Sequence, residues 1–145
     1  NLAVDTINVA GNAISTVDTV YTAAMISAGG VWTTIQTLVV DKGRTDPMTI
    51  LVSFNLGTQP TNGNDNNPGR FSGQWRVKVG ATVVYTRTLA YNNYDTQAQT
   101  VDVDTIAIDN SGTTGVRTIT VEMLRTQGLA MGASDRSITV LNMLK

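Results

Sequence analysis

Alternation of apolar and polar residues is the feature that most constrains how this chain folds. In residues 116–126, apolar side chains occupy every second position from Ile119 to Met123, and polar side chains such as Glu122 lie between them. This spacing puts the apolar set on one face of a β-strand and the polar set on the other. Long helical periodicity is absent, so the sequence predicts an all-β fold.

Further segments rich in Val, Ile and Thr are separated by turns rich in Gly and Asn. The predicted strands are residues 17–27, 32–41, 47–56, 73–79, 81–91, 100–108, 116–126 and 137–144. Segments 73–79 and 81–91 form a hairpin around Gly80, and a change of phase between Val103 and Ile106 predicts a β-bulge. The pattern predicts an antiparallel two-sheet β-sandwich, and the strand number and long connections favour a jelly-roll-like topology over an immunoglobulin-type one.

Within these strands, the alternation also predicts which side chains form the core. Ile50, Val52 and Phe54 face inward from one strand, and Val77 and Val79 from another. Trp32 and Trp75 are expected in the core rather than on a contact surface.

The first sixteen residues are apolar without a regular period. With 145 residues the chain fits one domain, which we divide into an N-terminal arm, residues 1–16, and a β-sandwich, residues 17–145. The arm has no turn residues before Gly11 and Asn12, and its apolar side chains need cover. Two arrangements remain open, packing on the arm's own domain or packing between copies around a shared axis. In the second, the candidate trimer-interface residues are Leu2, Val4, Ile7, Val9 and Ile14.

The residues that usually carry catalysis are missing. The chain has no His and no Cys, which removes the commonest general base, metal ligand and thiol nucleophile. Asp102 and Asp104 share one strand face, where a solvated face is expected rather than a glycosidase pair. The lysines Lys42, Lys78 and Lys145 are each expected to be exposed. The sequence predicts a protein that is not an enzyme and has no cofactor.

Charge and loop composition restrict the remaining partners. Charged residues make up 14% of the chain and the net charge is −1, so nucleic acid is not an expected partner. No apolar run is long enough to span a bilayer, so membrane insertion is not expected. The Asn-rich residues 62–67 contain one acid and no following Glu, so no metal site is predicted.

Three polar or aromatic segments are the candidate binding loops. They are the long connection 58–72, residues 91–95 and residues 127–135, and Tyr and Asn suit adaptable contacts. For Tyr91 a core position stays open, and Leu129 and Met131 either pack beneath their loop or face a partner. The candidate contact residues are Asn62, Asn64, Asp65, Asn66, Arg70, Phe71, Tyr91, Asn92, Asn93, Tyr94, Leu129 and Met131.

Both ends of the chain resemble a known family. The opening residues 2–14, the hairpin 75–79 with 83–85 and the closing strand 136–141 resemble the C-terminal region of siphophage tail-tip proteins, the central-fibre, host-specificity proteins of lambda-like phages. The resemblance carries no active-site motif.

The resemblance implies a homotrimeric tail-fibre tip domain at the distal end of a virion. Its loops would bind a receptor on the bacterial outer surface, either an outer-membrane protein or a polysaccharide. Two alternatives stay open, a structural domain that caps the fibre trimer and a polysaccharide depolymerase. The long connection 58–72 is not explained by the resemblance, which makes it the first candidate for contact.

Overall fold

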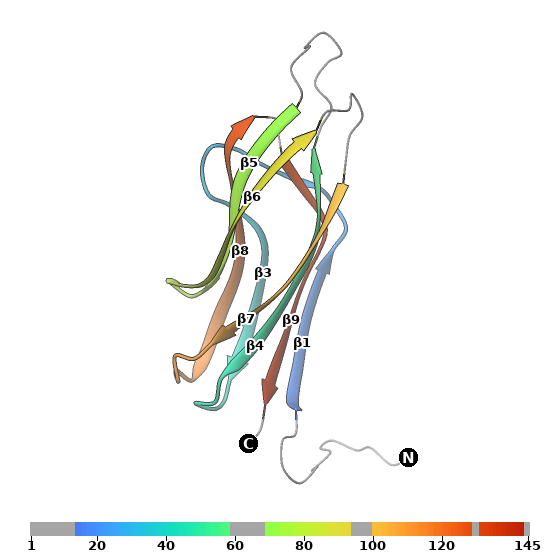
Figure 1. Ribbon diagram of the computed structural model, residues 1–145. Helices are drawn as coiled ribbons and strands as arrows, with labels where there is room; N and C mark the ends of the chain where they lie inside the picture. The colour runs from blue at the N-terminus through green and yellow to red at the C-terminus, as the bar shows by residue number, and fades with distance from the viewer. Residues whose placement is uncertain (1–13, 59–68, 94–99, 129–130, 144–145) are drawn as a thin grey trace, which may run out of the picture.

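The chain forms nine β-strands in the parts that the structure describes. The computed structural model describes residues 14–58, 69–93, 100–128 and 131–143 (Figure 1). The strands are β1 (Ile14–Thr22), β2 (Ile26–Ala28), β3 (Thr33–Lys42), β4 (Met48–Thr58), β5 (Gly69–Val79), β6 (Thr82–Asn93), β7 (Thr100–Asp109), β8 (Gly115–Gly128) and β9 (Met131–Met143). These residues contain no helix, and the predicted all-β fold is confirmed.

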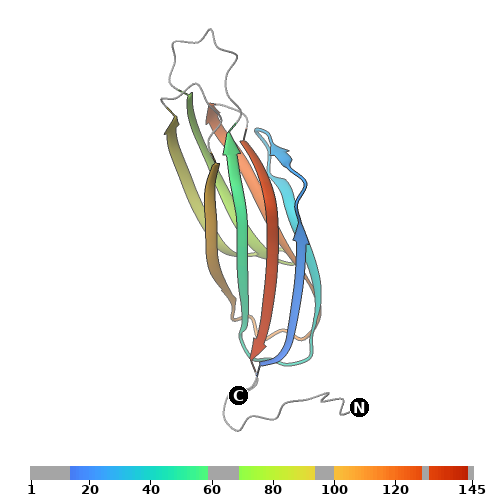
Figure 2. The ribbon, with the colours of Figure 1, turned by 90° about the vertical axis from the view of Figure 1, so that its right-hand side faces the viewer.

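The strands form two antiparallel sheets packed face to face (Figure 2). One sheet has the order β1-β9-β4-β7, with the short β2 also beside β9, and we call it sheet A. The other has the order β3-β8-β5-β6, and we call it sheet B. The predicted β-sandwich is confirmed.

The pairing pattern identifies the sandwich as a jelly roll. When β2 is set aside, the first long strand pairs with the last (β1 with β9), the second with the second last (β3 with β8), and so on to β4 with β7 and β5 with β6. Successive pairs alternate between the sheets. A chain folded back on itself as one long hairpin and then wrapped into two sheets gives this order.

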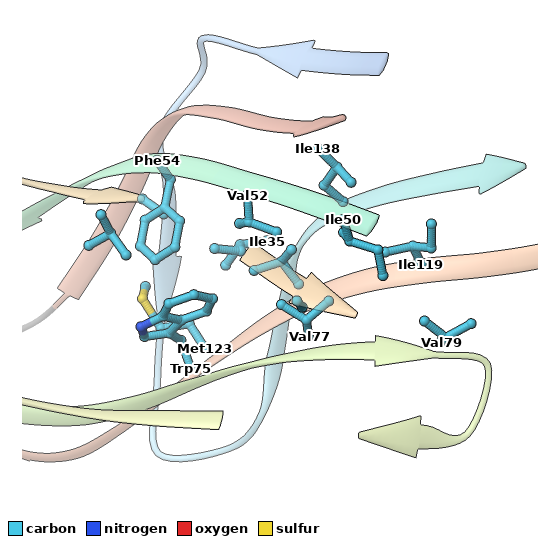
Figure 3. Packing of buried hydrophobic residues seen from close by; sticks show 14 of the residues in the cluster. Ile35, Ile50, Val52, Phe54, Trp75, Val77, Val79, Ile119, Met123 and Ile138 are labelled. Carbon is cyan, nitrogen blue, oxygen red and sulfur yellow. The ribbon is translucent and has the colours of Figure 1, made fainter. Parts of the chain in front are cut away.

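The core lies between the sheets, where the alternating apolar residues meet (Figure 3). Ile50, Val52 and Phe54 of β4 are at most 3% exposed, and Trp75 of β5 is fully buried. The Phe54 and Trp75 rings pack edge to face with centroids 5.4 Å apart, a geometry that aromatic pairs favour. The inward positions predicted for β4, β5 and β8 are confirmed.

Several predicted elements have different boundaries in the structure, and two of them differ most. The predicted strand 17–27 is divided between β1 and β2, which pair with different parts of β9. The predicted loop 127–135 is wrong for most of its length, because β8 continues to Gly128 and β9 begins at Met131. Cross-strand pairing extends both strands through Gly- and Ser-containing sequence that by itself favours a turn.

The predicted bulge in β7 is also wrong. Residues 100–109 pair with β4 without any shift of register. Val103 and Ala107 face the core, whereas Ile106 and Ile108 are 61% and 49% exposed on the outer face of sheet A. The apparent change of phase arose because both faces of this strand carry apolar residues.

One lysine prediction is wrong as well. Lys42, expected to be exposed, has only 2% of its side chain exposed at the end of β3. A register shift between Thr34 and Gln36 changes the phase of β3, and this turns Val40 and Lys42 inward.

Candidate functional site

The strand ends that flank the three candidate binding loops lie at one end of the sandwich. β5 and β6 meet there through Gly69 and Asn93, and β4 meets β9 through Thr58 and Met131. β1 begins and β9 ends at the opposite end, where Ile14 pairs with Met143 (Figure 1). The topology therefore separates the candidate loops from the start of the described chain.

Part of the candidate contact set can be placed on the strands. Arg70 and Phe71 lie in β5, opposite Asn92 and Tyr91 of β6, and Asn93 ends β6. Met131 is fully buried, in agreement with the alternative that it packs inside the domain. The other candidates lie outside the described residues, namely Asn62, Asn64, Asp65, Asn66, Tyr94 and Leu129 of the loops and Leu2, Val4, Ile7 and Val9 of the arm.

A bulge in β9 creates a cluster of hydrogen bonds around the Asp135 carboxylate on the outer face of sheet A, which we call the Asp135 cluster. Between Ser53 and Asn55 of β4 the register with β9 shifts, and Asp135 adopts a φ of 48°. Its carboxylate accepts hydrogen bonds from the Tyr21 hydroxyl at 2.8 Å and the Asn55 amide at 3.0 Å, and from the Ser134 hydroxyl at 3.2 Å. The Tyr21 hydrogen bond is the main reason why the pKa of Asp135 is lowered, and the same bond raises the pKa of Tyr21.

The same bulge sends the next residue into the interior. Arg136 is 6% exposed, and its guanidinium donates to the carbonyl oxygens of Ile35 and Ala24. The Gln36 amide donates to the Arg136 carbonyl oxygen at 3.1 Å. These bonds join β9 of sheet A to β3 of sheet B, so the bulge holds the two sheets together. The sequence alone does not predict this role, because a bulge cannot be placed without knowing the partner strand.

The two aspartates of β7 lie beside this cluster. Asp104 is opposite Ser53 of β4, and Asp102 is opposite Asn55. Both side chains are exposed, as expected for a solvated strand face. In the described residues, no group of three or more acidic, His or Cys side chains could hold a metal ion.

The outer face of sheet B carries a compact charged cluster. The carboxylate of Glu122 in β8 forms two ion pairs. Its Oε2 lies 2.6 Å from Arg76 Nε, and its Oε1 lies 3.2 Å from Lys78 Nζ. The Arg76 guanidinium carbon lies 4.0 Å from the ring centroid of Trp32. Trp32 is therefore a half-buried residue of the outer face, and its predicted core position is wrong. Burial raises the pKa of Glu122, but the bonds from Arg76 and Lys78 outweigh burial and the net pKa is lowered. One carboxylate therefore pairs with both cations of the cluster.

On the outer face of sheet A, the half that lies away from the Asp135 cluster is uncharged and mostly apolar, with threonines among its residues. Two rows of paired residues cross its four long strands at the end where β1 begins, and we call them the apolar patch. One row runs Ile108, Thr49, Leu141 and Val17, and the next runs Ile106, Leu51, Thr139 and Thr19. Val17 is 58% exposed, similar to the two isoleucines. The patch contains no charged residue.

Comparison with known proteins gives a likeness of fold alone. No protein-family model and no curated protein matches the sequence. The solved structure of the infectious bursal disease virus Gx strain covers 87% of this chain at a TM-score of 0.55 and 19% identity. The structure of the T13 particle of that virus matches with a TM-score of 0.54 and 17% identity. The structure of mutant VP2 protein in derived T=1 particles matches with a TM-score of 0.52 and 15% identity. Both matches cover 87% of this chain. The chain spans about a third of these proteins' own length, namely 32%, 30% and 31%.

These neighbours correct the family prediction. They come from the particle and the VP2 protein of infectious bursal disease virus, not from siphophage tail-tip proteins. The predicted tail-tip family is therefore wrong, and so is the tail-fibre, receptor-binding function that was inferred from it. The opening and closing motifs misled because short runs of Val, Ile, Thr and Asn recur in many β-domains. The described part of the chain contains no helix that could cross a membrane.

Proposed function

We propose that this chain is a structural domain of a virus particle, and that it acts by associating with further copies of itself. The observation that carries the proposal is the jelly-roll pairing of the eight long strands, together with the fold likeness to VP2 in T=1 particles. Jelly rolls are the common domain of viral capsids, although lectins and cupins also use them. The fold alone therefore needs support from the surface.

The composition of the chain supports this role. A net charge of −1 and only 14% charged residues give little electrostatic repulsion between copies. On the outer face of sheet B, Glu122 also pairs with Arg76 and Lys78 within one chain. Such a surface suits close packing of identical domains. The proposed assembly is a homo-oligomer located in the virion, and three copies is the expected number.

The proposed role involves no catalysis. The chain lacks His and Cys, and the strongest polar clusters serve the fold. Asp135 and Arg136 hold the β9 bulge, and Glu122 forms ion pairs with Arg76 and Lys78. No metal or cofactor is part of the proposal.

Self-association of the full chain tests the proposal. We expect sedimentation velocity to show a concentration-dependent trimer or larger assembly, and negative-stain electron microscopy to show closed or regular particles at high concentration. A chain that stays monomeric at every soluble concentration would contradict the proposed function.

A further inference from the structure

We propose that the apolar patch is covered by residues 1–13 of the same chain, the part of the arm that precedes β1. The inference does not depend on the proposed function, since it concerns one chain only. It decides between the two arrangements that the sequence leaves open for the N-terminal arm.

The patch needs an occupant. Its residues Val17, Ile106 and Ile108 are 58%, 61% and 49% exposed, and the register places them in two adjacent rows across the sheet. Soluble monomers rarely leave contiguous apolar surface of this kind open to water. The outer face of sheet B offers a contrast, because charged residues such as Arg76 and Glu122 already pair there.

The arm has the matching chemistry. Its large apolar residues fall in two short groups, Leu2 with Val4 and Ile7 with Val9, and its only charged side chain is Asp5. Because neither the patch nor these two groups of arm residues contains a charged side chain, their contact would bury no charge. The contact would therefore remove apolar area from water without a large desolvation cost.

The position where the arm leaves the domain favours this contact. β1 begins at Ile14, three residues before Val17 of the patch, at the same end of the sheet. Gly11 and Asn12 stand just before β1, and both residue types favour a chain reversal. Thirteen extended residues reach about 43 Å, whereas four adjacent strands span roughly 15 Å. The arm is long enough to turn back and cross the whole patch.

The short tether favours the chain's own arm over the arm of a second copy. A segment joined to its binding surface through a few residues acts at an effective concentration of about millimolar. The arm of a second copy would compete for the patch only when the protein itself reaches about that concentration in solution. At micromolar protein the intramolecular contact is therefore expected to dominate.

Disulfide trapping tests the contact directly, since the natural chain has no cysteine. The test variant carries Ile7→Cys and Thr139→Cys, with Thr139 at the centre of the patch. The control carries Ile7→Cys and Thr118→Cys, with Thr118 exposed on the outer face of sheet B. At micromolar protein we expect the test variant alone to close an intrachain disulfide, seen by peptide mapping. Equal closure in the control, or bonds only between chains, would overturn the proposal.

Hydrogen exchange gives a second test that does not need new cysteines. In the natural chain we expect amides of residues 2–10 to exchange slowly, with protection independent of protein concentration. Thr139→Asp should speed their exchange at least tenfold, whereas Thr118→Asp should leave it unchanged, with circular dichroism confirming the fold of both. Unprotected amides in the natural chain would refute the contact. Protection that grows with concentration would assign the patch to a second copy instead.

Discussion

At the scale of single residues, Gly73 shows how closely the chain packs at the loop-bearing end of the sandwich. A Cβ atom added to Gly73 would lie 2.7 Å from Cε and Sδ of Met131 in the opposite sheet and 2.8 Å from the Leu124 carbonyl oxygen. The Met131 side chain can turn aside, but the Leu124 backbone cannot. The position therefore requires glycine for close approach.

Replacement of this glycine should destabilise the fold. We expect Gly73→Ala to lower the free energy of unfolding by about 1–3 kcal/mol through overpacking. Gly57→Ala in β4 is the matched control, because the nearest atom to its added Cβ is the Gly132 carbonyl oxygen at 4.0 Å. Urea unfolding of the two variants measures the difference. Equal stability would show that the Gly73 contact relaxes freely.

The Asp135 cluster makes a prediction about proton binding. The Tyr21 hydroxyl is the main cause of the lowered pKa of Asp135. Tyr21→Phe removes this donor and should raise that pKa toward the ordinary value for aspartate, while Asn55 and Ser134 still donate. NMR titration of the Asp135 carboxyl measures the change. Val17→Ala, on the same strand and outer face but outside the hydrogen-bond cluster, should leave the titration unaltered.

At the scale of elements, a buried ion pair joins the end of β3 in sheet B to the end of β7 in sheet A. Lys42 Nζ lies 3.6 Å from Asp109 Oδ2, and both side chains are at most 3% exposed. Burial raises the pKa of Asp109, but the hydrogen bonds from Ser111 and the charges of Lys42 and Arg117 together lower it. Among the described residues, Lys42 Nζ has no hydrogen-bond partner, and Asp109 is the acidic group that pairs with it.

The two halves of this pair should respond differently to mutation. Asp109→Ala leaves the Lys42 ammonium buried without a counter-charge and should cost about 3–5 kcal/mol of stability. Lys42→Met should cost much less, because Ser111 still donates to Asp109 from its amide and hydroxyl. Chemical denaturation of both variants and of the double variant tests the asymmetry. A larger loss for Lys42→Met would contradict it.

The elements also show how far the sequence predicts this fold. In the strands β4, β5 and β8 every second residue along the central part is apolar and faces the core, and these inward residues were predicted correctly. Strands with two apolar faces, such as β7, lose that signal, and the change of phase between Val103 and Ile106 was assigned to a bulge that does not exist. The inward turn of Lys42 depends on a register shift with β8, which only the folded partner strand reveals.

The candidate site was less predictable than the fold. Asp135 lay in a segment predicted as a loop, and Arg136 directly follows it. Their roles arise from contacts with Tyr21 and Ile35, far away in sequence. The apolar patch collects residues from four strands that no local pattern brings together. Local alternation specifies which face a side chain takes, whereas a site on this fold depends on the order of strands across the sheet.

At the scale of the whole molecule, three carboxylates connect stability to pH. The pKa values of Asp109, Glu122 and Asp135 are all lowered in the folded chain. A carboxylate whose pKa is lowered on folding stabilises the folded state at pH values above its unfolded-state pKa, which is about 4. This stability is lost as the pH falls through the folded-state pKa. We expect the free energy of unfolding to be constant from pH 7 to 5 and to fall below about pH 4. The triple variant Asp109→Asn, Glu122→Gln and Asp135→Asn, followed in urea, should show a flatter profile.

Removal of the arm gives a second prediction for the whole molecule. If residues 1–13 cover the apolar patch, their deletion exposes Val17, Ile106 and Ile108 and should increase self-association, measured by sedimentation against the full chain. A matched truncation that also carries Ile106→Asp and Ile108→Asp should reverse the increase. If the arm instead joins copies around a shared axis, the same deletion would dissociate the assembly.

The nested order of the strand pairs also has a consequence for how the chain folds. The innermost pair, β5 with β6, closes through Gly80 and Ala81 alone, whereas β1 finds its partner β9 more than a hundred residues later, as the Thr19–Ile138 hydrogen bond illustrates. Each inner pair shortens the loop that the next outer pair must close. We therefore expect the chain to fold in milliseconds to seconds, which is typical of such long-range pairing. We also expect folding to proceed outward from the central hairpin. During synthesis β1, although made first, stays unpaired until β9 has left the ribosome.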